Sequence, residues 1–176
     1  MTFDQLVIEK IEPILRRWGY KIVERYENFF RFQSGNVEMR IAYNFLDKGH
    51  YFEIGKKNAH LHPINDSSIK QVFGVDIKVE QVSKEVFADN IVVFLETKGS
   101  DILKGNLDKL TQLETFVVQK SEKYTSGLIE KQCLESANKA WDSGNYREFI
   151  RLLEHIHVDN IPKSYLLKYK IASQRI

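Results

Sequence analysis

Two histidine pairs are the residues whose type and spacing first suggest chemistry. His60 and His62 fall in the polar segment 58–68, where an extended chain would direct both rings to one side. Two such rings could ligate a metal ion, but zinc sites normally use three or four protein ligands, and we identify no third beyond Asp66. His60 and His62 are therefore an incomplete pair of candidate ligands, and we predict no metal site and no cofactor.

The second pair, His155 and His157, falls in a stretch that we expect to be helical. Residues two apart on a helix point to nearly opposite faces, so these rings could not chelate one ion. We expect them at the surface on either side of a buried Ile156. Cys133 is the single cysteine, which excludes an intrachain disulfide. Because no base is marked beside it, a buried structural thiol is favoured over a nucleophile.

Short acid–basic spacings permit an enzymatic interpretation. A helix followed by three or more strands resembles the core of metal-dependent nucleases of the restriction-endonuclease type, which place an acid on one strand and an acid-x-lysine pair on the next. The candidate segments here are Glu38-Met39-Arg40, Glu53-x-x-Lys56 and Asp76-Ile77-Lys78. Each departs from that pattern in residue type, spacing or upstream acid. The chain also has no phosphate-binding glycine loop, no G-x-S-x-G and no H-E-x-x-H, so a non-enzymatic protein is favoured.

Arg25, Arg31 and Arg40 stand among aromatic residues, which suggests a nucleic-acid interface. Sheet surfaces can bind single strands by stacking bases on exposed aromatic rings beside cations. We expect most of these aromatic side chains to point into the core instead. Acidic residues share the outer positions and would repel phosphate: Glu24, Glu27, Glu38 and Glu53. Cross-strand Glu–Arg pairs are the favoured interpretation, and nucleic-acid binding through the arginines is the alternative.

These residues must be positioned by an antiparallel meander between Tyr20 and Lys57. Four segments read as strands: 20–28, 29–35, 36–45 and 50–57. The third has the clearest period of two, which is typical of a sheet with one buried face. Its expected core-facing residues are Val37, Met39, Ile41, Tyr43 and Phe45. Turn residues at 34–36 and 47–49 favour hairpins between the strands.

Helical patterns surround the meander. Residues 3–18 are predicted to form a first helix that Thr2 caps, that Gly19 ends and that Pro13 kinks or divides. A short helix should begin at Ser67 or Ser68 and end at Gly74.

An alternating segment at 75–80 then predicts a fifth strand. Beyond it we expect helices only, over 83–98 and along an apolar stripe within 107–141. The pattern leaves open whether residues 107–141 form one helix or two.

The C-terminal stretch 137–172 resembles the later part of one tetratricopeptide unit. The resemblance is carried by Ala137, Ala140, Gly144-Asn145-Tyr146, Phe149, Leu153, Ile156 and Pro162. In that family, small residues let two helices pack closely and a Gly-x-Tyr turn joins them. Phe149 stands where the family usually has alanine, and Pro162 comes one position late. The resemblance implies one helical hairpin without binding residues, because a repeat array needs about three copies.

The bulk composition limits the classes of protein. The chain has 176 residues, 43% of them hydrophobic, and a net charge of +2, which predicts an ordered globule without a basic nucleic-acid-binding character. The N-terminus lacks the basic start and apolar core of a signal peptide. The longest apolar run, residues 91–95, is far shorter than the roughly 20 residues of a membrane span. We therefore expect no membrane partner and a cytoplasmic location.

Together these patterns predict an α+β fold: an N-terminal helix on an antiparallel meander of four to five strands, followed by an all-helical C-terminal segment. The expected division is an α+β part over 1–80 and a helical part over 81–176, which could share one core. By elimination we expect a non-enzymatic module that binds another protein. In size and layout the chain resembles small bacterial immunity-type proteins, which inhibit a partner by covering its active site. Nucleic-acid binding or metal-dependent nuclease activity through the sheet is the alternative.

Overall fold

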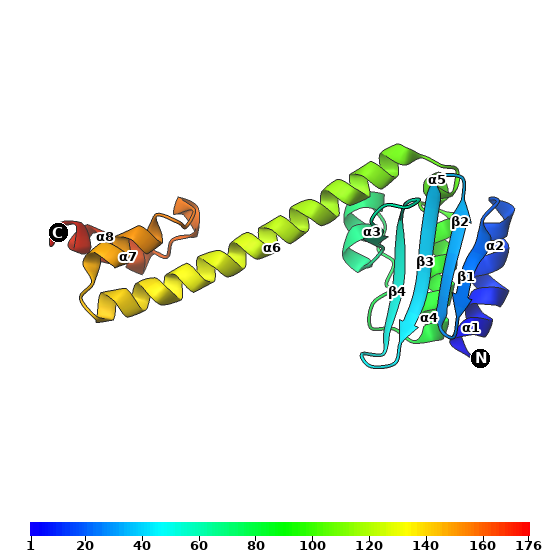
Figure 1. Cartoon of the computed structure of the whole chain (residues 1–176), viewed down its shortest axis with the longest axis horizontal. Coiled ribbons are helices and arrows are strands. Elements are labelled where there is room, and N and C mark those ends of the chain that lie inside the picture. Colours follow the sequence, from blue (N-terminus) through cyan, green and yellow to red (C-terminus); the bar gives the residue numbers. More distant parts are fainter. The chain divides into compact units, whose positions relative to one another are not determined.

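The computed structural model describes residues 1–176 and divides them into two compact units, Met1–Val118 and Gln119–Ile176 (Figure 1). The first unit contains an N-terminal helical segment, a five-stranded antiparallel sheet and further helices. The second unit is helical. This arrangement confirms the predicted α+β class. The predicted change of secondary structure at residue 80 falls inside the first unit, whose core includes Phe87 and Phe94 from beyond that point.

The N-terminal helical segment consists of α1 (Phe3–Leu6), the π-helical turn η1 (Val7–Ile11) and α2 (Glu12–Arg17). Thr2 caps it, as predicted: its hydroxyl accepts a hydrogen bond from the Gln5 N–H at 3.2 Å, and the Gln5 side chain accepts one from the Thr2 N–H at 2.8 Å. This reciprocal pair satisfies two of the backbone donors that a helix start leaves free.

Pro13 is accommodated by the π-helical turn. A proline inside an α-helix removes one backbone hydrogen bond and clashes with the carbonyl of the fourth residue before it. In η1 the Glu12 N–H bonds to the Val7 carbonyl instead, five residues back. Pro13 then lies in the first turn of α2, where a missing N–H costs little. The sequence predicts that Pro13 kinks or divides this helix; the structure instead shows a π-turn within one continuous helical segment.

The sheet is a meander whose strand order follows the chain order. Its strands are β1 (Lys21–Tyr26), β2 (Phe29–Ser34), β3 (Val37–Asn44), β4 (Gly49–Lys56) and β5 (His62–Pro63). In β3 the residues Val37, Met39 and Ile41 are buried while Glu38 and Arg40 are half-buried. The alternation read from the sequence therefore places one face of β3 in the core.

Two expectations about the sheet are wrong. Phe45 lies beyond the end of β3, in the turn to β4, and its side chain is 64% exposed. Residues 75–80 form no regular secondary structure and pair with no strand. The fifth strand is instead β5, in which His62 pairs with Ile54 of β4. The edge of β4 that does not pair with β3 therefore pairs with β5, which is too short to show a period of two in the sequence.

Helices cover one face of the sheet. In Figure 1, α4 (Lys84–Glu96) runs behind the strands, and it packs against α1, η1 and α2. The Phe94 ring of α4 lies 6.5 Å from that of Phe52 on β4 and 4.9 Å from that of Phe73. Ion pairs at the rim join Lys10 to Asp89 at 2.5 Å and Arg17 to Glu96 at 2.7 Å. The core of the first unit therefore lies between the sheet and these helices.

Phe73 ends α3 (Asp66–Phe73), the short helix predicted just before residues 75–80. The helix begins slightly earlier than expected, because the Asn65 side chain caps it by accepting a hydrogen bond from the Ser68 N–H at 2.9 Å. Gly74 ends it as predicted, with φ of 72°. A further short helix, α5 (Ser100–Leu103), follows α4.

One continuous helix, α6 (Leu107–Asp142), answers the question that the sequence left open. It contributes buried Leu110 and Leu113 to the first core and buried Ala137 and Ala140 to the second. Gly127 lies inside this helix without interrupting it, and a side chain added there would meet nothing within 4 Å.

The second unit also contains α7 (Tyr146–Leu153), a 3₁₀ turn η2 (Val158–Asn160) and α8 (Lys163–Ser173). Gly144 adopts φ of 73° in the turn before α7, a left-handed conformation that favours glycine. The buried residues of this unit are Ala137, Ala140, Phe149, Leu153, Ile156 and Ala172. The alanines let the helices approach closely around the single buried aromatic ring.

Candidate functional site: the open face of the sheet

The sheet turns one face away from α4, and we call this the open face. Figure 1 shows the strands in front of α4, with the open face toward the viewer. Its side chains belong to the residues that alternate with the buried ones on β2, β3 and β4. They form two parallel rows across the strands, one charged and one mostly aromatic, which the strand register defines.

The charged row runs Glu24, Arg31, Arg40 and Glu53 from β1 to β4. Arg31 forms an ion pair with Glu24, and Arg40 donates through Nη1 to Glu53 Oε2 at 3.0 Å. Glu38, two residues before Arg40 on β3, lies with its Oε1 3.7 Å from Arg31 Nε. The cross-strand Glu–Arg pairs expected from the sequence are therefore present, and each guanidinium faces at least one carboxylate.

The aromatic row runs Tyr26, Phe29, Ala42 and Tyr51 on the same four strands. Tyr26 is 63% exposed and Tyr51 is 43% exposed. The Tyr26 and Phe29 ring centroids lie 5.9 Å apart, and the Arg40 guanidinium lies 6.0 Å from the Phe29 ring centroid. The small Ala42 separates the Tyr26–Phe29 pair from Tyr51 in the row.

Tyr51 is held in place by the turn that precedes its strand. Its hydroxyl donates to the Asp47 carboxylate, which also accepts from the Gly49 N–H at 2.8 Å. The hydrogen bond from Tyr51 is the main reason that the pKa of Asp47 is lowered, and it raises the pKa of Tyr51. Near neutral pH the carboxylate is charged and the phenol is protonated, so the ring is presented in one orientation.

Arg25 does not share this surface. It pairs across the strands with the buried Phe30, and its guanidinium lies 5.2 Å from the Phe30 ring centroid. Asp4 of α1 lies 3.8 Å from the guanidinium. Of the three arginines of the nucleic-acid alternative, the structure therefore brings Arg31 and Arg40 together on the open face and places Arg25 on the helix side.

The pair His60 and His62 is split between solvent and core. The ring centroids lie 5.4 Å apart, but His60 is exposed whereas His62 is 8% exposed and its Nδ1 has no hydrogen-bond partner. Burial lowers the pKa of His62, against an opposing effect of Glu114. No group of three or more His, Cys, Asp or Glu side chains in the chain is arranged to hold a metal ion.

His155 and His157 follow the end of α7 rather than lying on a helix, which corrects the sequence-based expectation. Both are exposed on either side of buried Ile156, as predicted. Cys133 is half-buried rather than buried, on α6 beside the core of the second unit. These residues converge on no common site.

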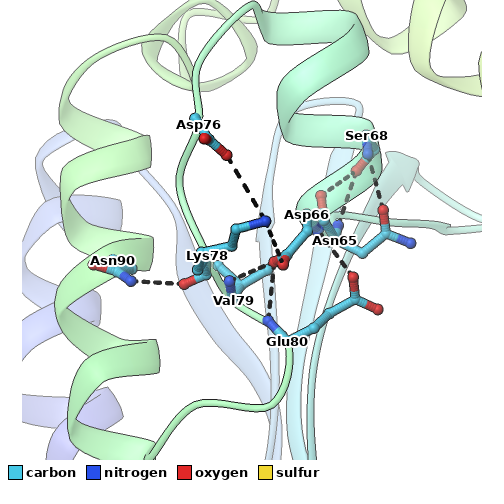
Figure 2. Close-up of polar contacts among 8 residues, drawn as sticks. All are labelled: Asn65, Asp66, Ser68, Asp76, Lys78, Val79, Glu80 and Asn90. Atoms are coloured by element: carbon cyan, nitrogen blue, oxygen red, sulfur yellow. Dashed lines mark hydrogen bonds and ion pairs between the residues drawn. The ribbon is translucent and has the colours of Figure 1, made fainter.

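The acid–lysine pair Asp76 and Lys78 belongs to a polar network around Asp66, shown in Figure 2. The Lys78 ammonium lies 3.4 Å from Asp66 and 3.8 Å from Asp76. The Asp66 carboxylate also accepts hydrogen bonds from the backbone N–H groups of Val79 at 2.7 Å and Glu80 at 3.0 Å. These hydrogen bonds fix segment 75–80, which has no strand partner, to the start of α3.

The same contacts set the protonation of Asp66. Burial alone would raise its pKa, but the Val79 and Glu80 N–H groups and the Lys78 ammonium together hold the pKa below its usual value. The carboxylate is therefore charged and already occupied by three donors. This cluster joins the start of α3 to the segment before α4 and has a structural role.

The aromatic row is the feature that sequence reasoning missed. The adjacent pair Phe29 and Phe30 required one ring to leave the core, and the burial of Phe30 assigns Phe29 to the open face. Tyr51 follows from the same rule, because Phe52 beside it is buried. The signal was present in the alternation, but only the register shows that these rings and Tyr26 form one row.

Comparison of the chain with protein-family models, with curated proteins and with solved structures found no match. None of its helices combines the length and the apolar character that crossing a membrane requires.

Proposed function

We propose that this chain is a non-enzymatic protein-binding module and that its partner docks on the open face of the sheet. The observation that carries the proposal is the row of exposed Tyr26, half-buried Phe29 and exposed Tyr51 beside Arg31 and Arg40. Tyrosine, phenylalanine and arginine are enriched in protein interfaces, and tyrosine and arginine are frequent among the few residues that supply most of the binding energy. The rows lie on paired strands, so little ordering is required when a partner binds.

The charges of the open face favour a protein over a nucleic acid. Glu24, Glu38 and Glu53 outnumber Arg31 and Arg40, and both guanidiniums already face carboxylates. A phosphate chain would have to compete with these carboxylates for the guanidiniums, whereas a protein surface can match alternating charges. In the immunity-type form of the proposal, the partner is an enzyme whose active site this face covers.

The test is a tagged pull-down from the host lysate with and without nuclease, followed by reconstitution with the purified partner. The variants are Tyr26→Ala and Tyr51→Ala, and the matched control is Tyr124→Ala, which removes a tyrosine that is 69% exposed on α6. We expect a nuclease-resistant 1:1 complex whose Kd rises by at least about tenfold in each open-face variant, because hot-spot truncations cost about 2 kcal/mol.

An unchanged Kd in both open-face variants would exclude this face as the interface. For the immunity-type form, the purified complex should also abolish the partner's enzymatic activity in stoichiometric proportion. A partner that remains active in the complex would exclude inhibition while leaving protein binding in place.

The alternative function is binding of single-stranded nucleic acid, and the neighbouring Tyr26 and Phe29 rings beside Arg40 are the observation that favours it. It predicts that capture disappears after nuclease treatment and that affinity for an oligonucleotide falls steeply with added salt. Arg40→Gln should then weaken binding, whereas Arg25→Gln on the other face should not.

A further inference from the structure

The second unit contains a groove of about 360 Å³ that the open face of the sheet does not involve. Its walls are formed by the end of α7, the η2 turn and α8. The apolar lining residues are Leu153, Ile156, Val158, Ile161, Leu166 and Tyr169. Val158 is 70% exposed and Leu166 is 39% exposed, so the lining is accessible from solvent.

The η2 side of the groove is fixed in position. The Glu130 carboxylate on α6 accepts hydrogen bonds from the His157 N–H at 3.1 Å and from Asn160 Nδ2 at 2.8 Å. These two bonds lie on either side of Val158 along the chain. The exposed valine is thus presented by an anchored turn, as in a preformed binding site.

Two exposed lysines of α8 flank the part of this helix that lines the groove. Lys163 and Lys170 have no ion-pair partner in the chain, and they bracket Leu166 and the 64% exposed Leu167. These four residues stand at i, i+3, i+4 and i+7, so they share one helical face. Two turns of helix separate the lysines, about 10 Å along the axis.

The other cations of the C-terminal segment point elsewhere. Lys168 donates to the Asn138 side chain at 3.2 Å, and Arg175 donates to the Tyr146 hydroxyl at 2.8 Å. No acidic residue occurs after Asp159. The single charged residue in the groove lining is Glu154, which lies on the α7 side. The groove is therefore polarised, with Glu154 in its lining on the α7 side and two unpaired lysines beside Leu166, just outside the lining, on the α8 side.

From these observations we infer that the groove binds an amphipathic acidic segment of a partner protein. Apolar side chains of that segment fill the space over Val158 and Leu166, and two carboxylates about 10 Å apart pair with Lys163 and Lys170. Charge complementarity selects this occupant, because a basic peptide would face both lysines. The concave shape favours side-chain anchors over the flat surface of a membrane.

This inference does not depend on the open face of the sheet. The groove belongs entirely to the second unit, whereas the aromatic row belongs to the first. Each surface can therefore fail its own test without affecting the other.

The experiment uses the full chain and a fluorescein-labelled helical peptide of about 16 residues, with two leucines between two glutamates in the i, i+3, i+4, i+7 pattern. Fluorescence anisotropy should show saturable binding. The variant Lys163→Glu/Lys170→Glu should weaken it by at least about tenfold, and a peptide with lysine in place of glutamate should restore binding to this variant. Leu167→Ser should weaken the wild-type interaction as well.

The matched control is Lys57→Glu/Lys98→Glu, which makes the same charge change at exposed positions of the first unit. It should leave peptide affinity unchanged, and unaltered Trp141 emission would show that the groove variants remain folded. Failure of the peptide to bind, or equal affinity in the groove and control variants, would overturn the inference. Binding of vesicles with anionic lipid headgroups, lost in the groove variants and without peptide binding, would assign the surface to a membrane instead.

Discussion

The hydrophobic cores of the two compact units differ in size and in the residues that form them. In the first, strand pairing brings large side chains together from distant parts of the sequence, and Phe52, Phe73 and Phe94 meet from a strand and two helices. In the second, six residues are buried, and three of them are alanines. Much of its remaining apolar contact comes from half-buried rings such as Trp141 and Tyr165.

This difference implies unequal tolerance of substitution. The first core contains many large side chains, so the loss of one leaves most of the buried area intact. In the second, Phe149 is the one buried ring, with Trp141 at 5.3 Å and Tyr165 at 6.2 Å between ring centroids. Small cores provide only a few kcal/mol of net stability. One truncation should therefore be enough to unfold the second unit.

The largest predicted effect is that of Phe149→Ala, which should destabilise the second unit by about 3–5 kcal/mol. The two tryptophans report separately, because Trp18 lies in the first unit and Trp141 in the second. Urea titration should show Trp141 already in an unfolded environment without denaturant, while Trp18 keeps its transition.

Phe94→Ala is the matched truncation in the first unit and carries the same expected cost. Here the Trp18 transition should move to lower urea concentration but persist, because the rest of the core remains. A single transition shared by both tryptophans in either variant would show that the units unfold together, and the comparison would fail.

Asp66→Ala should have the next largest effect, a loss of about 2 kcal/mol from the first unit, because it leaves two backbone N–H groups without an acceptor. Asp66→Asn keeps an acceptor and should cost less. Since the folded pKa is lowered, this stabilisation is present above the unfolded pKa of about 4 and is lost as pH falls through the folded value. Equal losses in the two variants would contradict a role for these hydrogen bonds.

Gly127→Ala should raise the stability of the second unit by about 1 kcal/mol, because glycine is a poor residue in an exposed helix interior. The control is Gly144→Ala, which should lower stability because φ is 73° there. Trp141 emission in urea measures both. A lower urea midpoint for Gly127→Ala would contradict a regular helix at this point of α6.

The smallest predicted effect concerns His50, a half-buried residue whose ring stacks on Phe87 at 4.9 Å. Burial lowers its pKa, against an opposing effect of Glu85. Its contribution to stability is therefore complete above the ordinary histidine pKa of about 6.5 and is lost as pH falls below it. In His50→Phe, the decrease in the Trp18 urea midpoint between neutral pH and pH about 5 should be smaller than in the wild type. His155→Phe, at an exposed position in the second unit, should not change that decrease.

Local patterns predicted much of the first unit. The Thr2 cap, the Gly74 stop and the alternation in β3 each depend on neighbouring residues, and the structure confirms all three. Residues 75–80 show the limit of this reasoning. Their alternation is real, but the hydrogen bonds that fix the segment come from a side chain, and a period of two does not reveal the bonding partner.

The candidate site depended on information that the sequence carries only indirectly. The alternation along β2 and β3 places Arg31 and Arg40 on one face. In β1, however, a bulge between Ile22 and Glu24 shifts the register of pairing with β2 by one residue. That shift brings Tyr26 to the open face and Arg25 to the helix side. Since one extra residue exchanges the two faces of a strand, the aromatic row could be recognised only after the register was known.

The strand order of the sheet has a consequence for how the chain folds. Each strand pairs with the next one along the chain, from β1 to β5, so the meander needs no long loop to close before it forms. Such neighbouring contacts are associated with fast folding. During synthesis from the N-terminus, all five strands leave the ribosome before α4, which forms much of their cover. The sheet can therefore be assembled early beside the N-terminal helical segment, and the arrival of α4 is the step that completes the cover of its apolar face.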